Sequence, residues 1–187
     1  VPDTLYGQRW TNNTYIGAAL YKNQGQYIHY GFDGNICLLG QKLGDFQING
    51  QIDAGFKLGK DSMTMSAKAY IKNETPDFYL QRYRSNHYQW DNTFKNTYRF
   101  YLGGEIAYPT QWIKPKLNIS FENLTRYIYF AENGMPKQMD GNIQVLAANL
   151  QLNFTTPWVN LENRIVYQHS SSDALPLPTL TMYNNLY

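Results

Sequence analysis

The side chains that could carry catalysis or bind a metal are few, since the 187 residues include three histidines and one cysteine. His29, His87 and His169 lie far apart and fit no metal-ligand spacing. His169 precedes a serine, a pairing used in nucleophilic catalysis, but neighbours on a strand point apart and no orienting acid is identifiable. Cys37 is flanked by isoleucine and leucine, which offer nothing to activate a thiol. The sequence therefore predicts no catalytic, cofactor or metal site.

Charged residues form a second group, and their positions follow a simple rule. Apolar and polar residues alternate in six segments of the chain, and every Asp, Glu, Lys and Arg inside them lies on a polar position. Because successive side chains of a strand point to opposite faces, this pattern predicts strands with one apolar and one polar face. The charged candidates for the polar face are Asp45, Asp53, Lys57, Lys68, Arg99, Glu105, Lys114, Lys116, Glu122, Glu162 and Arg164.

The elements that must position these residues are about nine strands. The six clearest segments are Asp45–Leu58, Ser62–Lys72, Tyr98–Tyr108, Trp112–Glu122, Ile143–Phe154 and Val159–Gln168, and weaker ones are Thr14–Lys22, Tyr27–Leu38 and Leu180–Tyr187. A soluble sandwich also separates apolar from polar faces. Its strands, however, average about 5–6 residues, whereas a strand that crosses a bilayer needs about 9–11. The six segments have the spanning length, and a charge at the lipid midplane would cost about 2–4 kcal/mol.

The connections between the segments alternate in length. Short ones are Asn23–Gly25, Gly59–Asp61, Pro109–Gln111 and Thr155–Pro157, and long ones are Asn73–Lys95, Ala131–Gly141 and His169–Pro178, with the short Gln41–Gly44 link in the long-loop register. Outer-membrane barrels have short periplasmic turns and longer external loops. Tyr108, Trp112 and Trp158 lie beside the short turns, where an aromatic girdle is expected.

The fold class expected is therefore all-β, a transmembrane antiparallel up-and-down β-barrel, with residues 1–187 forming a single barrel domain. The mean hydropathy of −0.54 agrees, because alternation cancels the average. No apolar run is long enough for a transmembrane helix, and no signal peptide is visible. Bacterial barrels have an even number of strands and must close, so about nine strands suggest a fragment of a longer chain.

Four residues break the alternation. Pro115 lies on an apolar position inside a strand, which suggests a bulge or a late strand start. Asn142 and Gln144 also lie on apolar positions, so they are expected either above the bilayer or beside a bulge that shifts the register. Asn163 is the remaining exception.

Three stretches, Tyr98–Glu105, Val166–Ser172 and Leu175–Tyr187, contain a Tyr-Gln strand end, a Leu-Pro loop and a Tyr-Asn-x-Leu-Tyr strand. In these features the chain resembles the putative outer-membrane porin family of Bacteroidota. The resemblance implies a barrel in the bacterial outer membrane and a role in passive transport.

Two functions are compatible with these patterns, and neither is enzymatic. The first is a porin-like channel for passive passage of small hydrophilic solutes, in which the charged candidates line the pore and set its field. Because both signs are present, strong ion selectivity is not expected. The alternative is an occluded structural or partner subunit of a larger outer-membrane complex, in which the same charges pair with each other or with a plug.

The long loop Asn73–Lys95 is rich in aromatic rings and arginines. Arg82, Tyr83, Arg84 and Trp90 could stack on a sugar or stabilise a constriction, or the loop could pack on itself and on lipopolysaccharide. The expected partners are membrane lipid, lipopolysaccharide and other outer-membrane proteins. A net charge of +2 without a basic cluster predicts no nucleic-acid partner.

Overall fold

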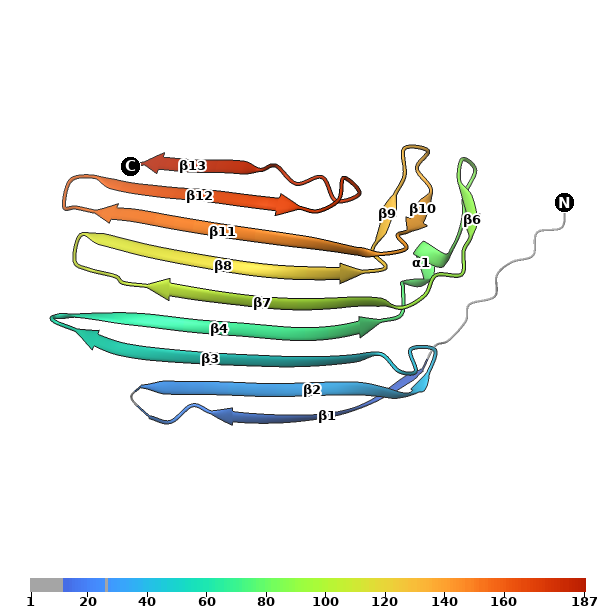
Figure 1. Ribbon diagram of the computed structural model, residues 1–187, viewed down its shortest axis with the longest axis horizontal. Coiled ribbons are helices and arrows are strands. Elements are labelled where there is room, and N and C mark those ends of the chain that lie inside the picture. The colour runs from blue at the N-terminus through green and yellow to red at the C-terminus, as the bar shows by residue number, and fades with distance from the viewer. Residues whose placement is uncertain (1–11, 26) are drawn as a thin grey trace, which may run out of the picture.

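Nine long strands form one antiparallel sheet in the computed structural model, which describes residues 12–25 and 27–187 (Figure 1). Long strands that follow one another in the chain are neighbours in the sheet, so the sheet is an up-and-down meander. The strands are β1 (Asn13–Lys22), β2 (Ile28–Gly40), β3 (Phe46–Leu58), β4 (Asp61–Glu74), β7 (Thr97–Ala107), β8 (Ile113–Thr125), β11 (Asn142–Thr155), β12 (Asn160–Ser170) and β13 (Leu180–Leu186). The predicted all-β, up-and-down architecture is confirmed.

The register between strands collects the apolar positions on one face, which we call the outer face. Leu102 of β7 lies opposite Ala69 and Phe121, and Phe121 lies opposite Leu146. The intervening polar positions share the other face, here called the inner face, where Ser120 lies opposite Gly103. One-residue slips would move whole apolar rows to the wrong face, so this continuous register follows from the alternation itself.

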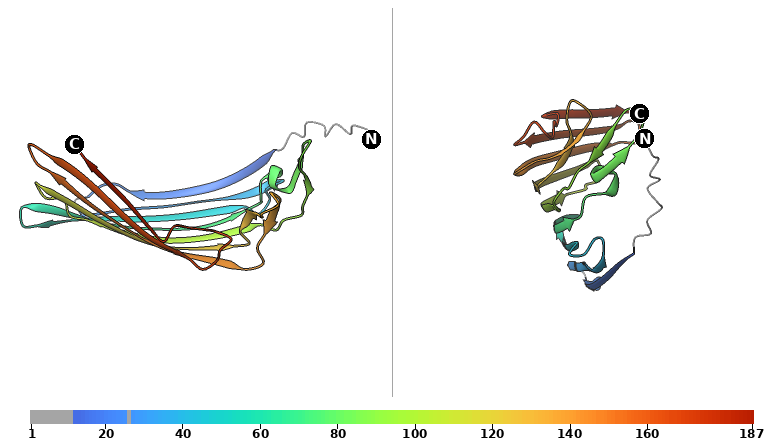
Figure 2. Two further views of the ribbon diagram at one scale, coloured as in Figure 1. Left: turned by 90° about the horizontal axis from the view of Figure 1, so that it is seen from above. Right: turned by 90° about the vertical axis from the view of Figure 1, so that its right-hand side faces the viewer.

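Exposure of the two faces is the reverse of that in a soluble protein. On the outer face Ile48, Ile52 and Ile119 are 54%, 46% and 51% exposed. On the inner face Gln47 and Asn49, which flank Ile48 in β3, are half-buried. Figure 2 shows why, since the sheet is a single curved layer. Side chains crowd together on a concave surface and spread apart on a convex one.

Short and long connections lie at opposite ends of the sheet, as predicted (Figure 1). At the turn end, β3 and β4 are joined by Gly59 and Lys60, and Gly59 adopts a φ of 68° that favours glycine. At the loop end, the long loops contain small elements that the sequence did not predict. These are α1 (Phe78–Gln81), the hairpin of β5 (Arg82–Arg84) with β6 (Gln89–Asp91), and the hairpin of β9 (Ile128–Phe130) with β10 (Pro136–Gln138).

The exceptions to the alternation are explained by where they lie. Pro115 needs no bulge, because the β7–β8 ladder ends at the pair Ala107–Lys116, and the Pro115 carbonyl still accepts a bond from the Tyr108 N–H at 3.1 Å. Asn163 lies on the outer face, but its side-chain amide donates to the Leu152 carbonyl oxygen at 3.0 Å. A polar group on a lipid-facing wall needs such a partner.

Asn142 and Gln144 lie at the loop end of the outer face without any register shift between β8 and β11. Their partners across the ladder are Thr125 and Asn123, which are also polar. The apolar rows begin beyond them, and in β11 extend from Leu146 to Phe154, a length that matches the about 9–11 residues of a spanning strand. Of the two alternatives, a position above the apolar band is therefore the one that the structure supports.

The sheet does not close on itself. Among the described residues, β1 pairs only with β2 and β13 pairs only with β12. The architecture is consistent with a partial β-barrel. In the described part of the chain, no helix is long and apolar enough to cross a membrane.

Candidate functional site

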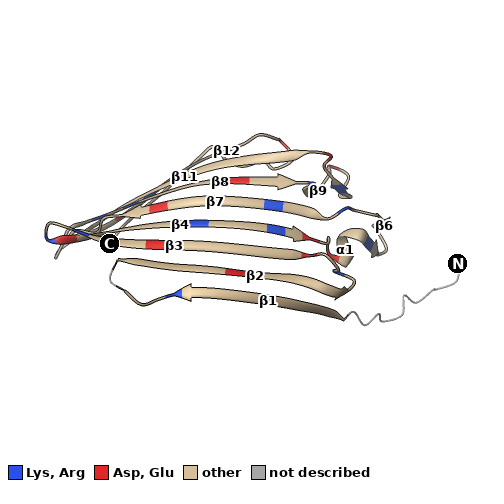
Figure 3. Ribbon diagram, turned by 60° about the horizontal axis from the view of Figure 1, so that its bottom comes forward, with Lys and Arg blue, Asp and Glu red and all other residues tan. Residues whose placement is uncertain are grey.

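The register places nearly all of the predicted charged candidates on the inner face. Figure 3 shows how charged residues are distributed along the strands. Glu105 and Lys116, for example, come from the neighbouring strands β7 and β8 and form an ion pair of 2.9 Å. The same face holds Asp53, Lys57, Lys68, Arg99, Lys114, Glu122, Glu162 and Arg164.

Asp45 differs from the prediction, because it is buried at the loop end and does not face an open lumen. It is 5% exposed, and its carboxylate accepts bonds from the Thr75 N–H at 2.8 Å and the Thr75 hydroxyl at 2.7 Å. The Asn96 amide donates to the same oxygen at 3.4 Å. Thr75 and Asn96 are the two ends of the loop between β4 and β7, so Asp45 anchors that loop.

The centre of the inner face is a cluster of paired charges and stacked rings. Arg99 pairs with Glu122, and the Tyr70 hydroxyl donates to the same carboxylate at 3.0 Å. The ring of Tyr70 stacks on Tyr101, with centroids 5.0 Å apart, and the Arg99 guanidinium lies 6.0 Å from the Tyr70 ring centroid. Opposite charges on neighbouring strands cancel much of each other's field at a distance. This cluster therefore holds the neighbouring strands together and adds little net electrostatic potential to the inner face.

The carboxylates on β2 and β3 are held differently, by neutral donors. Asp33 accepts from the Asn49 amide at 2.6 Å and from the Tyr21 hydroxyl at 3.2 Å. Asp53 accepts from the Gln51 amide at 2.7 Å. Among the described residues neither carboxylate has a cation within ion-pairing distance. Both line a cavity of about 530 Å³, which we call the acidic groove, and its one lysine is Lys68.

Asp33 was not among the predicted candidates. Its strand, β2, alternates weakly, because glycine occupies positions on both faces. The signal was present, since Asp33 is out of phase with Phe32 and Ile36, which lie on the outer face. Gly31 also has a specific role here, because a Cβ at that position would lie 2.6 Å from the Tyr21 ring. The ring of Tyr21 covers Gly31 and can therefore reach Asp33 with its hydroxyl.

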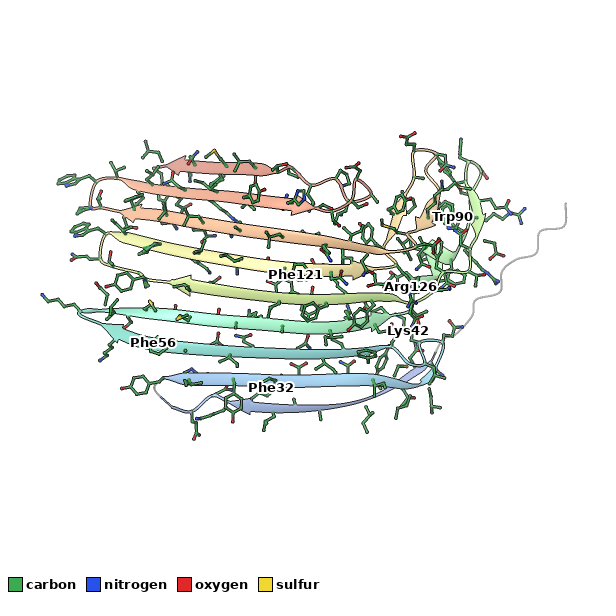
Figure 4. The ribbon with its side chains drawn as sticks, in the orientation of Figure 1. Phe32, Lys42, Phe56, Trp90, Phe121 and Arg126 are labelled. Atoms are coloured by element: carbon green, nitrogen blue, oxygen red, sulfur yellow. The ribbon has the colours of Figure 1, made fainter. Side chains whose placement is uncertain are left out.

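The aromatic loop between β4 and β7 folds on itself. Tyr83 and Trp90 stack with centroids 4.7 Å apart, and Arg82 pairs with Asp91 at 2.9 Å. The Trp90 indole N–H donates to the Tyr79 carbonyl at 2.9 Å, and its ring contacts Phe130 of the neighbouring loop. Figure 4 shows Trp90 among the loops beyond the end of the sheet. Of the four residues proposed for ligand contact, Trp90 is half-buried among these contacts, whereas Arg82, Tyr83 and Arg84 stay exposed.

Gln138 joins the two long loops at their bases. Its side-chain carbonyl accepts from the Lys95 N–H at 2.9 Å, and its amide donates to the Lys95 and Arg126 carbonyls at 2.7 Å and 3.1 Å. The Arg126 guanidinium donates to the Asn96 carbonyl at 3.1 Å. Figure 4 shows Arg126 and Lys42 at this end of the sheet. The loops therefore form one connected cap and do not extend separately from the sheet.

The connection between β12 and β13 folds onto the inner face, which the sequence did not predict. Leu124, Ile143 and Val145 occupy inner-face positions at the loop end and are buried, with Ile143 at 0% exposure. Ala174, Leu175 and Leu177 of the connection pack against them, together with Tyr127 and Met139. This is the main apolar core of the described residues. The sequence signal was an apolar residue at two successive inner-face positions of β11, Ile143 and Val145, and at Leu124, which lies opposite Ile143 on β8.

The predicted girdle residues lie at the turn end. Trp158 is 90% exposed and Trp112 is 47% exposed, and the Tyr108 hydroxyl donates to the Leu58 carbonyl at 3.4 Å. Tyr187, just beyond β13, donates to the Glu162 carboxylate at 3.2 Å, which raises the pKa of its phenol. Rings that are apolar with a polar edge suit the interface between lipid and water.

The structure also separates the one candidate pair for nucleophilic catalysis. His169 lies opposite Leu146 on the outer face, whereas Ser170 lies opposite Val145 on the inner face. The two side chains therefore project from opposite sides of β12.

Comparison with known proteins gives one match. The model of the family described as "Putative porin" matches residues 4–187, which is nearly the whole chain. The chain belongs to this putative porin family. Searches of curated proteins and of solved structures gave no match. Membership explains why the sheet of this porin-family chain is apolar outside and polar inside, and it supports an outer-membrane, porin-like role.

Proposed function

We propose that this porin-family chain forms part of the wall of a passive channel for small hydrophilic solutes in the outer membrane. The observation that carries the proposal is the reversed exposure of the two faces, with Ile48 54% exposed outside and Asn49 half-buried inside. Lipid accepts the outer face because its side chains are mostly apolar and because the backbone groups between neighbouring strands are paired. The inner face, rich in amides, hydroxyls and charges, suits contact with water and hydrophilic solutes.

The orientation follows from the two ends of the sheet. Outer-membrane barrels place short turns on the periplasmic side and long loops outside. The turn end, with Trp112 and Trp158, would then face the periplasm. The connected cap of loops would face outward, where the polar belt of Asn123, Asn142 and Gln144 lies at the level of lipopolysaccharide. Membrane lipid and lipopolysaccharide are therefore the partners that we propose for the outer face.

Single-channel recording tests the proposal. The full-length protein, refolded and reconstituted into planar bilayers, should give stepwise currents whose size scales with the conductivity of the salt. Removing residues 78–93, which include α1, β5 and β6, should leave the unitary conductance nearly unchanged, because this loop packs on itself and on Phe130. Pure protein that inserts into bilayers and passes no current would contradict the channel function.

The alternative of an occluded structural or partner subunit is favoured by one observation. The segment 171–177 covers inner-face residues at the loop end, so part of the inner surface is closed by protein. A barrel that is plugged should yield no current, and it should co-purify with a fixed outer-membrane partner. Neither function involves a catalytic step, so we propose a non-enzymatic role.

A further inference from the structure

A cavity at the loop end of the inner face, which we call the mouth site, has two chemically different sides. Its volume is about 630 Å³, within the about 300–1,000 Å³ of typical ligand sites. One side is apolar and consists of Leu124, Val145, Leu175 and Leu177. The other side is charged, and it is lined by Lys42, Glu74, Asp77, Arg99 and Glu122.

Hydrogen bonds hold the apolar side in place. The Ser171 N–H donates to the Gln144 carbonyl at 2.9 Å, and the Gln144 N–H donates back to the Ser171 hydroxyl oxygen at 2.9 Å. The Ala174 N–H donates to the Ser172 hydroxyl oxygen at 3.2 Å. Leu175 and Leu177 are half-buried, so each packs on the sheet and still lines the cavity. The segment is therefore fixed with apolar surface turned toward the cavity.

The charged side presents both signs close together. Arg99 pairs with Glu122, and Lys72 pairs with Glu74 at 2.6 Å on the adjoining part of β4. Across the β7–β8 ladder, Arg99 lies opposite Leu124, so the charged and apolar sides meet directly. A simple ion or a highly polar solute would not bury the leucine side chains, so their apolar surface would contribute nothing to its binding. A solute with apolar groups would bury them and gain free energy.

We propose that the mouth site binds small amphipathic solutes of the short-peptide class, with apolar side chains against Leu175 and Leu177. The solute's ammonium group would face Glu74 and Glu122, and its carboxylate would face Arg99. Residues 171–177, together with Asp77 and Leu80 of the loop between β4 and β7, which also line the cavity, then determine which solutes enter. This inference rests on the proposed function, in which the inner face borders an aqueous passage.

Calorimetric titration of the full-length refolded protein tests the site, with the dipeptides dileucine and diserine as probes. Dileucine should bind about tenfold more tightly than diserine, because only it buries leucine side chains. Leu177→Ser should remove most of that difference. Leu180→Ser is the matched control, because Leu180 lies three positions further on the outer face and is 56% exposed. The control should bind both dipeptides as the unmodified protein does.

If Leu177→Ser fails to fold, a chemically modified dipeptide tests the site in the unmodified protein. N-acetylated, C-amidated dileucine keeps both apolar side chains but carries no charge. It should bind several-fold more weakly than dileucine, because it cannot pair with the charged side of the cavity. Equal binding of dileucine and diserine, or no binding of either, would overturn the proposal. Ion currents recorded with the same preparation separate the two claims. Currents without dipeptide discrimination reject the mouth site alone, whereas discrimination without currents rejects the channel alone.

Discussion

The outer and inner faces of this sheet are built from the same strands and differ in how much they vary. The outer face repeats one theme, and Leu102, Phe121 and Leu146 continue each other across three strands. The inner face changes along the sheet, from the acidic groove on β2 and β3, through the ion pairs of β7 and β8, to the apolar patch near Val145. Lipid requires an apolar surface on every strand, whereas a polar interior allows different side chains in different places. We therefore expect the residues that determine function on the inner face.

The strongest test of this contrast places a lysine on each face of the same strand. Ile119→Lys puts the charge in the apolar band, where Ile119 is 51% exposed, and should lower the free energy of unfolding in lipid vesicles by about 2–4 kcal/mol. Ser120→Lys points to the inner face and should change it by about 0.5 kcal/mol or less. Denaturant titration measures both. Equal losses for the two variants would mean that the faces contact similar surroundings.

Two carboxylates extend the comparison. Asp45 directly precedes β3, and Asp53 lies within β3. Asp45→Ala leaves the Thr75 N–H and hydroxyl without their acceptor in a buried site, which should cost about 1–3 kcal/mol. Asp53→Ala removes one bond from Gln51 at a half-buried position and should cost less. Protease digestion supplies a second measurement, because only Asp45→Ala should speed cleavage within the loop between β4 and β7. Cleavage at equal rates would show that Asp45 does not anchor that loop.

The nine strands could be predicted from sequence because one physical rule, alternation between lipid and a polar interior, acts at every second residue. Pro115 and Asn163 break that rule, and their tolerance depends on partners in neighbouring strands. Pro115 lies where the β7 ladder has ended, and Asn163 reaches the Leu152 carbonyl. Neither partner can be read from the residues on either side in the sequence.

The mouth site was missed for a related reason. Leu175 and Leu177 belong to a loop by every local signal, and their burial depends on Leu124 and Val145, which are distant in the sequence. For the aromatic loop, the stack of Tyr83 on Trp90 agrees with the alternative that the loop packs on itself, and composition alone does not reveal which rings meet. Local patterns therefore predict which face a residue occupies, and long-range packing decides what that face does.

Ion selectivity distinguishes the acidic groove from the paired charges. Asp33→Asn with Asp53→Asn removes two carboxylates that neutral donors hold, so the cation-to-anion permeability ratio should fall by about twofold or more. The matched pair Glu105→Gln with Lys116→Gln removes opposite charges that already cancel, and the ratio should stay nearly constant. Reversal potentials under a salt gradient report both. A larger shift for the paired variant would contradict the assignment of the acidic groove as the source of field.

The smallest effect concerns the two ends of the sheet and depends on where each tryptophan lies. Trp158→Ala should lower the free energy of unfolding in lipid vesicles by about 1 kcal/mol, since Trp158 is 90% exposed and loses contact with the membrane interface but few contacts with protein. Its position is better tested by fluorescence in variants that keep a single tryptophan. Brominated lipid should quench Trp158 at the turn end, where a girdle ring meets the acyl chains, and should leave Trp90 in the loop cap bright. Quenching of Trp90 and not of Trp158 would contradict the assignment of Trp158 to the membrane interface and of the loop cap to the water outside it.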